Sequence, residues 1–63
     1  MTSKLEQERL VRKFSRAKVA NDLNVHPNTL MEWEINPGKV KYENAIALAD
    51  YYQTSLQELF SDV

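Results

Sequence analysis

Apolar residues recur three and four positions apart through most of this chain, with polar residues between them. That spacing is typical of helices that bury one face, and no stretch keeps the alternation of a half-buried strand. The 63 residues include one glycine and two prolines, so signals that interrupt a helix are few. The pattern predicts an all-α fold of five short helices, organised as a single domain over residues 1–63.

Helix-start signals divide the first part of the chain. Ser3 followed by Glu6 is typical of a capping box, and it predicts a first helix through about Lys13. Ser15 is the predicted cap of a second helix, RAKVANDL, which Asn24 ends because asparagine tolerates the left-handed conformation at a helix end. The residues expected to face inward from these two helices are Leu5, Leu10, Val11, Phe14, Val19, Ala20 and Leu23.

Three further helices are predicted in the second part. One opens at about His26, with Pro27 at the first helical position, where the missing N–H costs nothing. The segment INPGKVK is typical of a loop. A fourth helix is expected over about Tyr42 to Tyr52, and a fifth begins at Ser55 with a second capping box. The residues expected to be buried here are Leu30, Trp33, Ala45, Ile46, Ala49, Tyr52, Leu56, Leu59 and Phe60.

Charge is segregated along the chain, although the net charge is only −1. Residues 1–18 carry six lysines and arginines against two glutamates, whereas residues 19–38 carry three acids and residues 42–63 carry four acids, with no base in either segment. Lys39 and Lys41 lie between these two acidic segments. The bases from Arg9 to Lys18 are either a solvated face or a surface that contacts phosphate.

The chain offers little for catalysis or for metal binding. It has no cysteine, and its one histidine, His26, cannot hold a metal ion alone. No Ser-His-Asp or paired-carboxylate arrangement is present, and a domain of this size leaves little room for a substrate cavity. We therefore expect a protein that is not an enzyme, needs no cofactor and binds no small-molecule substrate. The lack of a long apolar run or a signal peptide favours the cytoplasm over a membrane.

From Phe14 to Phe60 the sequence resembles the Cro/C1-type helix-turn-helix family, a phage repressor-like DNA-binding fold. SRAKVANDL resembles the second helix of that family, with Ala20 at the small position where two helices cross. Leu30, Trp33 and Glu34 keep the family's apolar-x-x-Trp-Glu order, and IALADYYQTSLQELF is close to its C-terminal segment. We expect Trp33 to belong to the core and Glu34 to make a structural contact to a neighbouring base or helix end.

The resemblance also implies which residues contact DNA. In this family the start of the third helix and the residues one turn later reach base edges in the major groove. Asn28 can pair with adenine and Glu32 can accept a hydrogen bond from cytosine, whereas Pro27 can do neither. The implied site residues are His26, Pro27, Asn28, Thr29 and Glu32 at the bases, and Arg16, Lys39 and Lys41 at the phosphates.

The acidic third helix leaves two functions open. Glu32 and Glu34 place negative charge where this family approaches DNA, and the segment HPNTLMEWE holds no lysine or arginine. The first hypothesis is a regulator of a phage-type genetic switch that forms a homodimer through its C-terminal helices and binds a double-stranded DNA operator. The second is an antirepressor that presents the two carboxylates to the basic DNA-binding surface of a partner repressor, where opposite charge would steer association.

Overall fold

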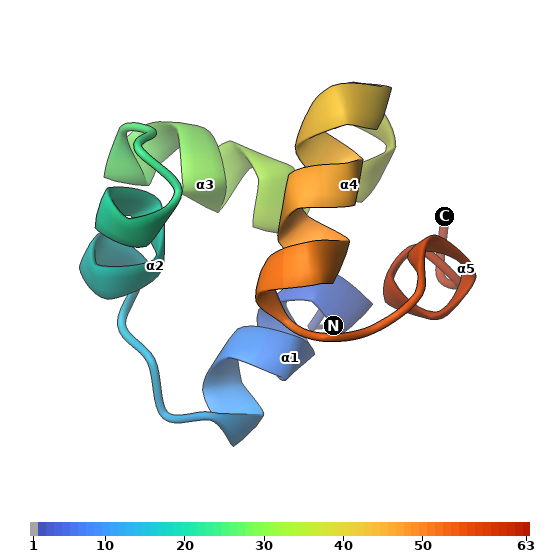
Figure 1. The fold of residues 1–63 in the computed structure, drawn as a ribbon, viewed down its shortest axis with the longest axis horizontal. Coiled ribbons are helices and arrows are strands. Elements are labelled where there is room, and N and C mark those ends of the chain that lie inside the picture. The colour runs from blue at the N-terminus through green and yellow to red at the C-terminus, as the bar shows by residue number, and fades with distance from the viewer. Residues whose placement is uncertain (1) are drawn as a thin grey trace.

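The computed structural model describes residues 2–63, and within them the backbone forms five α-helices, one 3-10 turn and no strand. Figure 1 shows α3 lying across one end of the molecule, with α2 beside its first half and α4 running away from its far end. The predicted all-α fold of five short helices is confirmed. The elements are α1 (Lys4–Val11), α2 (Arg16–Asp22), α3 (Pro27–Ile35), the turn η1 (Pro37–Lys39), α4 (Tyr42–Tyr51) and α5 (Leu56–Leu59).

Side chains cap the starts of four of these helices. The hydroxyl oxygens of Ser3, Ser15 and Ser55 each accept a hydrogen bond from the backbone N–H three residues later, at 3.2, 3.1 and 3.1 Å. His26 caps α3 with its ring Nδ1, which accepts from the backbone N–H of Asn28 at 3.1 Å. Each cap satisfies an N–H that the helix itself leaves unpaired, so the four predicted starts are confirmed. The remaining helix, α4, begins without a side-chain cap.

Three helices end in the same way, with one residue in the left-handed conformation. These residues are Lys13, Asn24 and Gln53, whose φ angles are 59°, 60° and 56°. The following N–H then bonds back to the helix, as from Val25 to the carbonyl of Ala20 at 2.9 Å, and satisfies a carbonyl at the helix end. The predicted end of the second helix at Asn24 is confirmed, whereas the first helix stops before Lys13.

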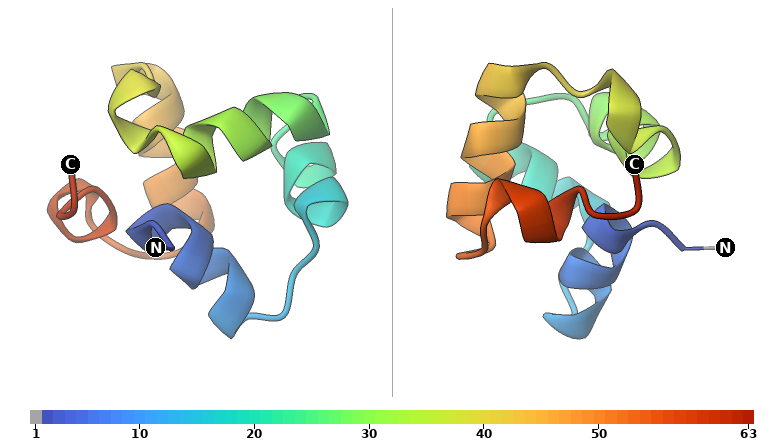
Figure 2. Two further views of the ribbon diagram at one scale, coloured as in Figure 1. Left: turned by 180° about the vertical axis from the view of Figure 1, so that it is seen from behind. Right: turned by 90° about the vertical axis from the view of Figure 1, so that its right-hand side faces the viewer.

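The core lies where the five helices meet. Figure 2 shows the start of α1 beside the C-terminal segment, and there the backbone N–H of Lys4 donates to Asp62 Oδ2 at 2.8 Å. No helix described for residues 2–63 is long and apolar enough to cross a membrane. The central cluster of buried side chains consists of Leu5, Val19, Ala20, Leu30, Leu48, Ala49, Tyr52 and Leu59.

Three residues that were predicted to face inward are exposed: Leu10 by 49%, Val11 by 72% and Ile46 by 43%. In α1 the inward positions are Leu5 and Arg9, four residues apart, so Leu10 and Val11 fall on other sides of the helix. The prediction failed there because a charged residue holds a position that the apolar pattern does not mark. In α4 the buried residues are Ala45, Leu48 and Ala49.

Trp33 packs against the core, as predicted. It is only partly buried, however, so it lies less deeply than a core residue. The side chain of Trp33 thus contacts the core and also reaches the surface of the protein. The other predicted core residues that pack against the cluster while partly buried are Phe14, Leu23, Leu56 and Phe60.

Candidate nucleic-acid interface

One side of α3 packs onto the protein and the other lies in solvent. Leu30 and Glu34, four residues apart, are both buried. Asn28 and Glu32, also four apart, are exposed and therefore share the outer side of the helix. The structure thus brings together the residues that were predicted to reach base edges. The others lie at the start of α3: His26 and Pro27, which are exposed, and Thr29, which is partly buried.

His26 and Pro27 fix the start of α3. His26 Nδ1 accepts a hydrogen bond from the Asn28 N–H, so the neutral ring carries its proton on Nε2. Pro27 occupies the first helical position, where no N–H is required. Both roles agree with the predicted start of this helix at about His26. Asn28 and Glu32 are then the exposed residues of α3 whose side chains carry hydrogen-bonding groups.

Glu34 is buried and joins three helices. Its Oε2 accepts from Arg9 Nε at 2.7 Å, and its Oε1 accepts from Arg16 Nε at 2.9 Å. Arg9 also donates through Nη1 to the carbonyl of Phe14 at 2.8 Å, in the loop between α1 and α2. A buried carboxylate with both oxygens bound to guanidinium groups is a structural element. Glu34 therefore presents no carboxylate to a partner, which corrects its place in the antirepressor hypothesis.

Ion pairs within the protein neutralise most of the basic N-terminal segment. Glu8 pairs with Arg12 at 2.7 Å and with Lys4 at 3.8 Å. Lys18 pairs with Asp22 at 2.8 Å. Within the part of the chain that the structure describes, Lys13 is the one base between residues 9 and 18 that forms no ion pair. The segment therefore offers less free charge to phosphate than its composition indicates.

Lys39 and Lys41 are different, because both are exposed and neither forms an ion pair within residues 2–63. Lys39 ends the η1 turn, and Lys41 is the residue before α4. Figure 1 shows this segment beside the end of α3. The first N–H groups of α4 have no side-chain cap, and unpaired N–H groups at a helix start favour anions. Lys39 and Lys41 therefore place two unpaired positive charges in the segment that leads into this helix start.

Two residues of this region, Arg9 and Glu6, were not predicted to belong to the site. The sequence indicates Arg9 only as one of several bases and Glu6 only as half of a capping box. The available signal for Arg9 was its spacing of four from Leu5, which places both on one side of a helix. Glu6 Oε2 lies 3.7 Å from Arg16 Nη2, and no local pattern indicates this contact, because it joins α1 and α2.

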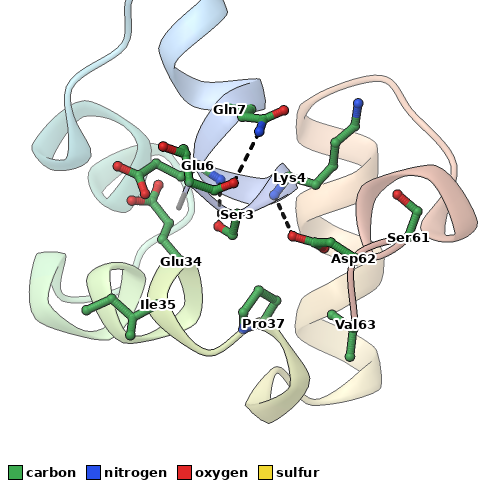
Figure 3. Close-up of a pocket in the computed structure, with 11 residues that line it drawn as sticks. Ser3, Lys4, Glu6, Gln7, Glu34, Ile35, Pro37, Ser61, Asp62 and Val63 are labelled. Carbon is green, nitrogen blue, oxygen red and sulfur yellow. Dashed lines mark hydrogen bonds between the residues drawn. The ribbon is translucent and has the colours of Figure 1, made fainter.

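A cleft of about 620 Å³ lies between the start of α1, the end of α3 and the C-terminal segment (Figure 3). Glu6 and Glu34 lie at one end of it and reach toward one another from α1 and α3. Its lining mixes charged and polar side chains with Ile35 and Val63, unlike the mostly apolar walls of small-molecule sites. Among residues 2–63, no three His, Cys, Asp or Glu side chains are grouped to hold a metal ion.

Comparison with known proteins bears on the family. A sequence model described as helix-turn-helix matches residues 5–59, which include α2, α3 and the turn that joins them. No curated protein and no solved structure gives a match. The match covers most of the chain and agrees with the packing of α2 against α3. The chain therefore belongs to the Cro/C1-type helix-turn-helix family of DNA-binding transcription regulators.

Proposed function

We propose that this regulator acts in a phage-type genetic switch in the cytoplasm and binds operator DNA through α3. The proposal rests on two observations: Asn28 and Glu32 are exposed on α3, and the exposed, unpaired lysines Lys39 and Lys41 lie in the segment that follows α3. Side chains that can read bases, next to side chains that can bind phosphate, are the two components of a specific DNA contact. Residues 1–63 would act as one domain.

In this arrangement α3 lies in the major groove. Asn28 pairs with an adenine and Glu32 accepts from the amino group of a cytosine, with His26, Pro27 and Thr29 alongside. Pairing through the C-terminal helices would present two copies of α3 to an operator with two-fold symmetry. The burial of Glu34 supports the proposal, because only one carboxylate of α3 then faces the DNA.

The phosphate contacts can be tested by changing lysines one at a time. Lys39→Gln and Lys41→Gln should each weaken binding to every DNA sequence and reduce the slope of log K against log salt by about one. Lys13→Gln is the matched control, because the loop after α1 that carries Lys13 lies at the opposite end of the molecule from α3 (Figures 1 and 2). Equal changes in all three variants would refute a defined phosphate contact at Lys39 and Lys41. Fluorescence anisotropy with a labelled duplex measures the affinities.

One observation favours a second candidate, the antirepressor. Glu32 is exposed and forms no ion pair within residues 2–63, so its carboxylate is free to meet the basic surface of a partner repressor. Opposite charge at such an interface would speed association and select the partner. The buried Glu34 contributes nothing to this contact, so the candidate depends on Glu32 alone among the carboxylates of α3.

Glu32→Gln separates the two candidates, because they assign opposite effects to this charge. If α3 binds DNA, the change removes repulsion from phosphate, so non-specific affinity should be equal or higher. If α3 binds a repressor, the change should slow association. Where the charge pair is buried in the complex, it should also weaken the binding free energy by about 2–5 kcal/mol. Both forms are measured against DNA and against a repressor encoded beside the gene. Repressor binding that weakens, with no DNA binding in either form, would replace our proposal by the antirepressor.

A further inference from the structure

Two carboxylates from different helices hold Arg16. Its Nε donates to Glu34 Oε1 at 2.9 Å, and its Nη2 lies 3.7 Å from Glu6 Oε2. The side chain of Glu34 is fully buried, whereas that of Arg16 is 40% exposed and that of Glu6 is 26% exposed. The inner edge of the guanidinium therefore binds α3, and its outer edge meets Glu6 of α1 at the surface.

The two contacts differ in strength. The Glu34 contact is short, and breaking it would leave a buried carboxylate with one oxygen unpaired, which is costly. The Glu6 contact is longer than a hydrogen bond and lies in reach of water and salt, where an ion pair contributes little. Glu34 therefore fixes the direction of Arg16. Glu6 Oε2 also lies 3.8 Å from Arg9 Nη2, so the Glu6 carboxylate can leave Arg16 at small cost while it keeps its pair with Arg9.

We propose that Glu6 competes with DNA phosphate for Arg16, so that the Glu6 carboxylate restrains the affinity of this regulator for DNA. Arg16 is then a phosphate contact whose orientation is set by Glu34. The inference rests on the proposed function, DNA binding through α3, and adds to it the phosphate contact that the family resemblance implies for Arg16 at the start of α2. A phosphate oxygen that binds the outer edge of Arg16 must take the place of the Glu6 carboxylate, because two anions repel each other there.

Glu6→Gln tests this competition. The variant keeps the shape of the side chain and the backbone N–H that the Ser3 hydroxyl caps, and it removes one negative charge, so thermal unfolding should confirm an intact fold. We expect tighter binding to both random and operator duplexes, with a salt slope steeper by about one. Because of that slope, the ratio of the DNA affinity of Glu6→Gln to that of the unchanged protein should fall about threefold between 50 and 200 mM salt. Glu8→Gln is the matched control, since Glu8 lies on the same helix but pairs with Lys4 and Arg12.

A double substitution distinguishes competition at Arg16 from a general change of charge. In a protein that already carries Arg16→Gln, Glu6→Gln should leave the salt slope unchanged. The proposal is overturned if Glu6→Gln has no effect on a protein that binds DNA, if Glu8→Gln has the same effect, or if the effect survives without Arg16. A failure of the proposed function is recognised separately, because then neither the unchanged protein nor Glu6→Gln binds any duplex, and the inference falls with it.

Discussion

Glu34 lies on the helix assigned to DNA binding, yet its charge serves the fold. Its partners Arg9 and Arg16 are 25 and 18 residues away in the sequence. The resemblance predicted a structural contact for Glu34, and that prediction is consistent with its burial. The identity of the partners could not be predicted, because no local spacing connects residues so far apart. The same distance in sequence explains why the role of Arg9 was missed.

Tyr52 offers a test at the scale of one residue. Its side chain is fully buried, and its hydroxyl has no hydrogen-bond partner among residues 2–63. Burial raises the pKa of Tyr52, and the nearby charge of Glu34 raises it further. Tyr52→Phe keeps the ring, which lies edge-on to Tyr51 at 5.1 Å between centroids, and removes the unpaired hydroxyl.

We therefore expect Tyr52→Phe to leave the free energy of unfolding unchanged or to raise it by at most about 3 kcal/mol. Urea unfolding followed by circular dichroism gives the difference. A loss of more than about 1 kcal/mol would contradict the absence of a favourable hydroxyl contact.

At the scale of elements, a surface cluster ties α2 to α4. Asp22 Oδ2 accepts from the Tyr51 hydroxyl at 2.6 Å and from Lys18 Nζ at 2.8 Å. The hydrogen bonds from Lys18 and then Tyr51 hold the pKa of Asp22 below its ordinary value of 3.8. The same bond to Asp22 raises the pKa of Lys18 above its ordinary value of 10.5. The cluster therefore favours the charged forms of both residues.

Asp22→Asn should make the protein slightly less stable at neutral pH, and acid should remove the difference. A carboxyl whose pKa is lowered by folding stabilises the fold above its unfolded value, and this stabilisation is lost as pH falls through the folded pKa. The raised pKa of Lys18 gives the opposite pH dependence: its stabilisation is present below pH 10.5 and is lost only as pH rises above that value. Unfolding curves from about pH 2 to pH 9 test this. A difference that persists at the acid end would contradict a role for the Asp22 charge.

Helix boundaries were predictable because their chemistry is local. Ser15 and Asn24 mark the start and the end of α2 within the segment itself, through a side-chain cap and a left-handed residue. The inward side of α1 was less predictable. Apolar spacing favoured Leu10 and Val11, but only the fold shows that Arg9 faces inward to meet Glu34.

For the whole molecule, free charge is more informative than net charge. The N-terminal segment appears strongly basic in sequence, yet four of its arginines and lysines between residues 9 and 18 are in ion pairs. Lys39 and Lys41 stay unpaired in the part of the chain that the structure describes, and they lie beside α3. Segregation along the sequence could not reveal this, because pairing depends on which helices meet.

The most direct test of the account is the affinity of the unchanged protein for DNA at several salt concentrations. The duplexes are the DNA next to its own gene and a random sequence of equal length. We predict that both bind, that the gene-adjacent duplex binds more tightly, and that log K for both falls linearly with log salt, because phosphate contacts release counterions. No complex with either duplex at 50 mM salt would contradict the claim that α3 and its flanking lysines bind DNA.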